Sequence, residues 1–175
     1  MTDYLPKYKV TQLPSRFMGY PEGTEIFVSP YDWGDTVRIK MTNANSLNFM
    51  KEILNGVKVD GLAKNLLTPQ DILFLGVYRN LVSSSHDKID IKSICPYCLA
   101  ENHTAKTLEA IKFNDIEDFT REDYPIEVDF DNYTMWFTFI TYKDFELCQR
   151  KFRGDTTYQV ALQVCKYQDK VAKET

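Results

Sequence analysis

Cys95 and Cys98 are the residues whose type and spacing point most directly to chemistry. Two thiolates separated by two residues can occupy one edge of a tetrahedral zinc site, because a tight turn lets both sulfurs converge on the ion. Such a site has four ligands, so the pair supplies half of it. His103 stands where a third ligand is expected in a zinc knuckle, and Cys148 is a more distant candidate. The pair predicts one structural zinc ion or, failing that, a packed turn, with no other cofactor.

The two remaining cysteines are more economically explained as core residues. Cys148 shares a helical stripe with Phe145 and Phe152, and Cys165 shares a face with Leu162. A free cysteine in such a stripe behaves as a small hydrophobic residue. The uneven spacing of the four cysteines also differs from that of a secreted disulfide framework, so we expect reduced thiols or a metal site.

The tetrapeptide C-P-Y-C at 95–98 is also found in the active site of glutaredoxins. In that context the first cysteine has a lowered pKa at a helix N-terminus, and the second resolves a mixed disulfide. Here the motif lies past the middle of the chain, Pro125 is the only proline after it, and no Gly-Gly pair follows. A thiol-disulfide oxidoreductase that uses Cys95 and Cys98 is therefore the alternative function rather than the main one.

A helix and a strand precede the cysteine pair and must position it. Thr68 can cap the helix, Pro69 fits its first position, and the carboxylate of Asp71 suits the helix dipole. Apolar residues over 72–82 then cover nearly the whole circumference, which is typical of a buried helix. Residues 89–94 alternate between apolar and polar types, which predicts a strand that leads into the cysteine turn.

The rest of the chain is expected to form hairpins and further helices. The expected strand pairs are 24–29 with 36–41, 89–94 with 104–113, and 126–130 with 133–141; the expected helices are 47–55 (capped by Ser46), 143–152 and 156–171. The sequence thus predicts an α+β fold: two antiparallel hairpins, a buried central helix, two C-terminal helices and a small Cys-x-x-Cys knuckle. We expect one domain over 24–175, with the Cys-x-x-Cys hairpin at about 89–113.

Residues 1–23 predict an extended N-terminal arm, because prolines and glycines interrupt any regular pattern there. The arm concentrates Leu13, Phe17, Met18 and Tyr20, which a purely flexible tail has no reason to gather. Either the arm packs on its own domain, or it contacts a partner with Arg16, Phe17 and Tyr20 as anchors. Trp33, in the expected first loop, is a further partner-binding candidate.

Composition narrows the function classes. The 175 residues are 43% hydrophobic, which suffices for one good core. With 21 basic and 25 acidic residues the formal net charge is -4, and no basic run occurs, so we expect no nucleic-acid partner. No segment has the length and apolar character of a membrane span or a signal peptide, which predicts a soluble protein made inside the cell. No G-x-S-x-G or Gly-rich phosphate loop occurs, so we expect no enzyme.

Three segments carry a resemblance when taken together. They are L-P-S-R-x-x-G-Y at Leu13–Tyr20, the L-T-P-x-D helix with its arginine at Leu67–Val82, and the strand into C-P-x-C at Ile89–Cys98. In this order they resemble the baseplate hub proteins of T4-type phages, a family that includes a distal hub subunit.

The resemblance implies a non-enzymatic structural or assembly component of the central hub of a bacteriophage tail baseplate. Such a late protein would be located in the virion tail and, during tail assembly, in the host cytoplasm. Its partners would be other baseplate hub or tail proteins. A zinc-stabilised adaptor protein outside phages is the remaining interpretation.

Overall fold

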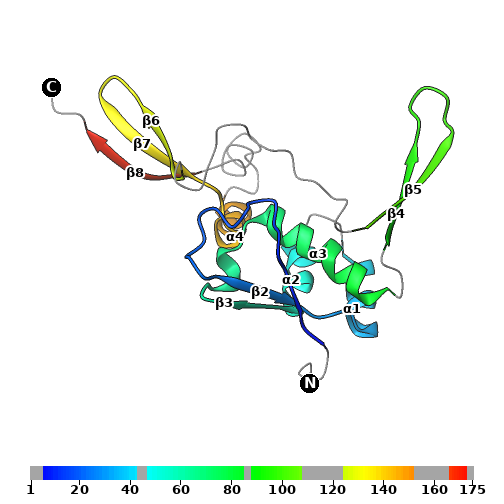
Figure 1. The fold of residues 1–175 in the computed structure, drawn as a ribbon. Helices are drawn as coiled ribbons and strands as arrows, with labels where there is room; N and C mark the ends of the chain where they lie inside the picture. Colours follow the sequence, from blue (N-terminus) through cyan, green and yellow to red (C-terminus); the bar gives the residue numbers. More distant parts are fainter. Residues whose placement is uncertain (1–5, 43–46, 85–87, 108–123, 152–165, 173–175) are drawn as a thin grey trace.

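The computed structural model describes residues 6–42, 47–84, 88–107, 124–151 and 166–172 (Figure 1). The helices are α1 Trp33–Lys40, α2 Leu47–Asn55, α3 Pro69–Ser83 and α4 Tyr142–Lys151, with a short 3-10 helix η1 at Lys64–Leu66. The strands are β1 Tyr8–Lys9, β2 Glu25–Val28, β3 Val57–Asp60, β4 Lys88–Ile94, β5 Glu101–Thr107, β6 Ile126–Asp129, β7 Tyr133–Thr138 and β8 Lys166–Ala172. These helices and antiparallel strands confirm the expected α+β class.

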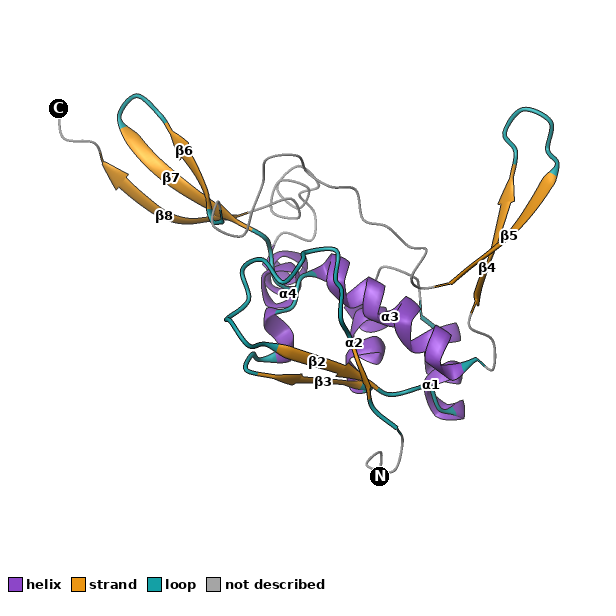
Figure 2. Ribbon diagram, in the orientation of Figure 1, coloured by secondary structure: helices purple, strands orange, loops and turns teal. Residues whose placement is uncertain are grey.

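The strands in the described residues form three small sheets, in the orders β1-β2-β3, β4-β5 and β6-β7-β8. Figure 2 shows the helices gathered beside the first sheet, while the other two sheets extend away from them. The main core therefore lies between the helices and the β1-β2-β3 sheet, and the two outer sheets extend from it.

Among the described residues, no helix has the length and apolar character needed to cross a membrane.

The core is built around contacts between α2, α3 and β2. Ile53 on α2, Leu75 on α3 and Ile26 on β2 are all fully buried. The two helices approach closely at Gly76, where an added Cβ would lie 2.7 Å from the Ile53 side chain. The expected bounds of α2 and the Thr68 cap of α3 are both found, since Thr68 Oγ1 accepts the Asp71 N–H at 3.2 Å. Ser46 lies outside the described residues.

The expected strand over 36–41 is wrong, because residues 33–40 form α1. Asp32 caps this helix: its side chain accepts the Asp35 N–H at 2.6 Å, and the Asp35 carboxylate reaches back to the Asp32 N–H. This capping box gives hydrogen-bond partners to two backbone N–H groups at the start of the helix, which favours a helix over a strand here. The alternation that ends at Met41 is misleading, since Met41 is 82% exposed. β2 pairs instead with β3.

The C-terminal part differs from expectation in one element. Residues 166–172 form β8, which pairs antiparallel with β7, so the expected helix over 156–171 is wrong in this part. Residues 152–165, with Cys165 among them, lie outside the described chain, as do residues 108–113 of the expected return strand. The expected strands at 89–94 and 126–141 and the helix near 143 are confirmed as β4, β6, β7 and α4.

Candidate functional site

The turn of the β4–β5 hairpin contains both cysteines of the C-P-Y-C motif. The Cys95 N–H donates to the Ala100 carbonyl at 3.0 Å, and the Leu99 N–H donates to the Cys95 carbonyl at 2.9 Å. Leu99 itself has a left-handed backbone, with φ of 57°. The backbone N–H groups of Cys98 and Tyr97 and the Cys98 thiol donate to the Cys95 sulfur and lower its pKa, because they stabilise the thiolate. The turn thus favours a thiolate at Cys95, as both zinc binding and thiol chemistry require.

The structure does not bring the other proposed ligands to this pair. His103 lies within β5, opposite Lys92 on β4, and its Nε2 is 3.5 Å from a Glu101 oxygen. Cys148 is 1% exposed in the core side of α4, where burial raises its pKa. In the described part of the chain, no group of three or more His, Cys, Asp or Glu side chains could hold a metal ion. Cys95 and Cys98 therefore fit half of a zinc site, and His103 and Cys148 do not complete it.

Large apolar side chains surround the cysteine turn and point into solvent. Ile94 is 64% exposed, Tyr97 is 96% exposed and Leu99 is 75% exposed. We call these three residues the hairpin tip. Single exposed apolar residues are ordinary on protein surfaces, but a group at the end of a projecting hairpin is typical of a contact surface.

The N-terminal arm is joined to α3 by a buried hydrogen-bond network, which we call the Asp71 clasp. The Ser15 N–H donates to Asp71 Oδ1 at 2.9 Å, and the Tyr20 hydroxyl donates to Asp71 Oδ2 at 2.5 Å. The Thr68 N–H in turn donates to the Tyr20 hydroxyl at 2.9 Å. Asp71 is fully buried, and this desolvation raises its pKa although the hydrogen bonds to its carboxylate oppose the shift. Burial and the Asp71 carboxylate raise the pKa of Tyr20.

The clasp separates the four proposed partner-binding residues into two kinds. Tyr20 is 5% exposed and faces the core, and the Phe17 ring packs edge-on against it with ring centroids 6.4 Å apart. Arg16 is exposed beside them, with a left-handed backbone at φ of 54°. Trp33 is 83% exposed at the start of α1. Arg16 and Trp33 are thus accessible to a partner. Tyr20, with the Phe17 ring packed on it, holds the arm to its own domain.

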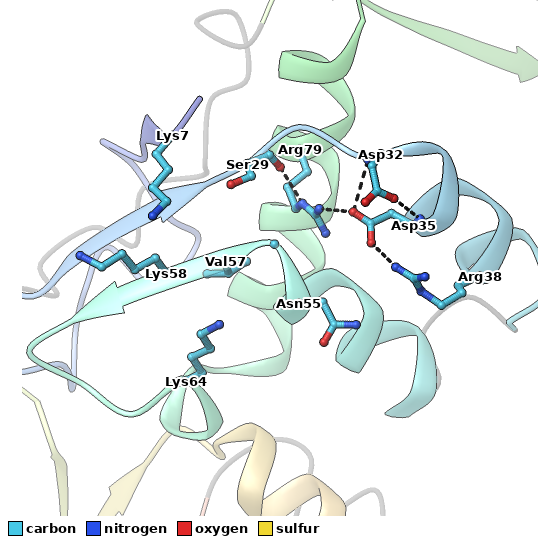
Figure 3. A pocket seen from close by; sticks show the side chains of 11 residues that line it. Lys7, Ser29, Asp32, Asp35, Arg38, Asn55, Val57, Lys58, Lys64 and Arg79 are labelled. Atoms are coloured by element: carbon cyan, nitrogen blue, oxygen red, sulfur yellow. Dashed lines mark hydrogen bonds and ion pairs between the residues drawn. The ribbon is translucent and has the colours of Figure 1, made fainter. Parts of the chain in front are cut away.

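Arg79 is a charged residue buried in the middle of the fold, and its side chain is 1% exposed (Figure 3). Its Nη2 donates to Asp35 Oδ2 at 2.7 Å and to the Pro30 carbonyl at 3.3 Å. Its remaining N–H groups donate to the carbonyls of Ser29, Ile53 and Glu52 at 2.8, 3.0 and 3.3 Å. The guanidinium therefore ties α1, α2 and the end of β2 to α3.

The approach of Arg79 to the end of α2 requires glycine at position 56. A Cβ added to Gly56 would lie 2.0 Å from Arg79 Nη2. Beside this contact is a cavity of about 400 Å³, which we call the Arg79 cavity. Its lining includes Lys7, Asp32, Asp35, Arg38, Asn55, Lys58, Lys64 and Arg79 (Figure 3). Five basic and two acidic side chains make it locally positive in a chain of negative net charge.

No protein family model, curated protein or solved structure matches this chain. Its function is therefore inferred from its own residues and their contacts.

The Arg79 cavity is the feature that the sequence pattern does not reveal. Its lysines come from three separate stretches of the chain, so no basic run marks them. The one usable signal is Arg79 itself, because an arginine inside an otherwise apolar buried helix needs a charged or polar partner. The identity of that partner, Asp35, depends on α1 being a helix rather than a strand.

Proposed function

We propose that this chain is a non-enzymatic structural or assembly component of the central hub of a phage tail baseplate. The Asp71 clasp carries the proposal. Its hydrogen-bonding residues belong to the motifs that resemble the hub proteins: Ser15 and Tyr20 to L-P-S-R-x-x-G-Y, Thr68 and Asp71 to L-T-P-x-D. These hydrogen bonds join two motifs that are distant in sequence. This contact supports the interpretation that the two motifs belong to one family pattern.

The exposed ends of the two outer sheets support an interaction role. The hairpin tip presents Ile94, Tyr97 and Leu99 to solvent, and Phe130, in the turn between β6 and β7, is 38% exposed. Aromatic and aliphatic side chains that lie at the ends of projecting hairpins can enter pockets on neighbouring subunits with little rearrangement of the core. A hub component must contact several neighbours, and these surfaces provide separate places for them.

We further propose that Cys95 and Cys98 supply two thiolates to one structural zinc ion that stabilises the hairpin turn. The hydrogen bonds from Tyr97 and Cys98 to the Cys95 sulfur suit a metal-bound thiolate, because they offset part of its charge. The zinc would fix the turn and so fix the orientation of the hairpin tip. The other two ligands would come from residues outside the described chain or from a partner.

A thiol-disulfide oxidoreductase is the second candidate. The lowered pKa and the partial exposure of Cys95 favour it, since an attacking thiolate must be both ionised and accessible. The two candidates differ in what the cysteines do in the purified protein. A redox protein turns over a mixed disulfide, whereas a structural site holds zinc and releases it to a chelator.

A complementation experiment tests the hub proposal. A stop codon in the gene of the encoding phage should abolish infectious particles, and the wild-type chain supplied from a plasmid should restore them. The double variant Tyr97→Ser, Leu99→Ser should restore few, because it removes two apolar contacts of the hairpin tip. Leu147→Ser is the matched control, since Leu147 is 50% exposed on α4 and lies away from the tip. Normal particles with intact baseplates in the absence of the chain would overturn the proposal.

A further inference from the structure

The Arg79 cavity has a positive end and a neutralised end. At the neutralised end, Asp35 binds both Arg79 at 2.7 Å and Arg38 at 2.6 Å. Arg38 also binds Glu52 at 2.8 Å. These two carboxylates and two guanidinium groups satisfy one another, and the Asp32 carboxylate also lines this end of the cavity, so this end offers no net positive charge to a ligand.

The other end is formed by lysines from three separate elements. Lys7 precedes β1, Lys58 lies on β3, and Lys64 begins η1 (Figure 3). Lys58 already pairs with Asp60 at 2.6 Å. Within the described part of the chain, Lys7 and Lys64 have no carboxylate partner. Two uncompensated ammonium groups therefore border one cavity of a protein whose net charge is -4.

Lys64 is the more constrained of the two uncompensated lysines. Its Nζ donates to the Leu54 carbonyl at 3.2 Å, which holds the ammonium group at the cavity wall. Burial, and after it the positive charge of Arg79, lower the pKa of Lys64. The ammonium group is thus held near a second cation, Arg79, and it has no carboxylate partner among the described residues. A negative group placed in the cavity would relieve this repulsion.

We propose that the Arg79 cavity binds an anionic group, a carboxylate or a phosphate, between Lys7 and Lys64. The ammonium groups would donate charge-assisted hydrogen bonds to its oxygens, and Lys58 at the rim would add to the attraction. Arg79 would contribute its field rather than a hydrogen bond, because its donors already bind carbonyls and Asp35. A cavity of about 400 Å³ has the size of an ordinary small-ligand pocket. The inference is independent of the hub assignment.

Calorimetric and NMR titrations of the whole chain with two probes test this inference. Inorganic phosphate and succinate, each at constant ionic strength, separate phosphate from carboxylate recognition. We expect saturable binding of at least one probe and a rise in the pKa of Lys64 on binding. Lys64→Gln and Lys7→Gln should each weaken binding about ten-fold, the value of one charge-assisted hydrogen bond. Lys58→Gln should weaken it less, because Lys58 is already paired with Asp60.

Lys143→Gln provides the matched control. Lys143 is exposed on α4 and does not line the cavity, so this variant should bind the probes as the wild type does. Circular dichroism would establish that each variant is folded. If Lys64→Gln does not fold, the binding measured for Lys7→Gln tests the inference. Binding that fails to saturate, that is absent for both probes, or that is equal in the Lys7 variant and the wild type would overturn the inference.

Discussion

Arg79 and Asp35 form an ion pair of 2.7 Å between side chains that are only 1% and 9% exposed. The pair joins α3 to α1 across 44 positions of the sequence. It also defines the neutralised end of the Arg79 cavity. A buried guanidinium is tolerated only when its donors are satisfied, and here the Asp35 carboxylate and four main-chain carbonyls do so.

Replacing Arg79 with methionine should destabilise the fold strongly. The substitution leaves the buried Asp35 carboxylate without its innermost partner and four carbonyls without a donor, so we expect a loss of about 3 to 5 kcal/mol in the free energy of unfolding. Urea denaturation of the purified variant measures this loss. Arg38→Met is the control, because Arg38 contacts the same carboxylate from the exposed side and should cost little. A similar, small loss in both variants would contradict the central role of Arg79.

The buried Asp71 carboxyl should make the stability of the fold depend on pH. Its pKa is higher in the folded chain than in the unfolded chain, so the folded state takes up the proton more readily. This contribution favours folding at low pH and is lost as the pH rises through the folded pKa. As the pH rises above about 4, the usual pKa of an aspartate, the wild type should therefore lose stability relative to Asp71→Asn, which cannot ionise. Unfolding curves of the two proteins, measured side by side at several pH values, test this trend. A difference in the free energy of unfolding that stays constant with pH would refute it.

Helix α3 should not accept a charge at position 75. Leu75 is fully buried in the core, with a solvent exposure of 0%. Leu75→Asp should therefore cost at least about 3 kcal/mol or abolish folding. Val77→Asp on the same helix is the matched control, because Val77 is 40% exposed and its aspartate could remain hydrated. Thermal melts compare the two, and equal melting temperatures would disprove the placement of Leu75.

Local signals predict the elements that position the cysteine turn. Thr68, Pro69 and Asp71 mark the start of α3 because capping and dipole effects act within one turn of the helix. The alternation over 89–94 similarly identifies β4. The conflict at 36–41 arises because alternating residues satisfy a strand pattern, while the capping box of Asp32 and Asp35 satisfies a helix, and the local hydrogen bonds prevail.

Long-range contacts set the parts of the candidate site that local patterns miss. The side of the arm that faces Asp71 depends on a turn in which Arg16 and Phe17 both have left-handed backbones, a conformation that their residue types do not suggest. The Arg79 cavity depends on lysines brought together by the pairing of β1 and β3 with β2. Neither arrangement leaves a periodic signature in the sequence.

The cysteine pair should hold zinc in the purified protein. We expect about one zinc per chain by elemental analysis, and the melting temperature should fall when a chelator removes the metal. Cys95→Ser should abolish zinc binding, whereas Cys148→Ala should retain it, because Cys148 is buried in α4. A zinc content well below one per chain, with a Cys95→Ser variant as stable as the wild type, would leave only a packed turn.

Copurification of the tagged chain from infected cells is the most direct test of the hub assignment, with partners identified by mass spectrometry. Baseplate hub or tail proteins should be recovered with the wild-type chain and with the Leu147→Ser control. The double variant Tyr97→Ser, Leu99→Ser should recover them poorly while remaining folded. Recovery of the folded wild-type chain without any tail protein, from cells in which tails are assembling, would contradict it.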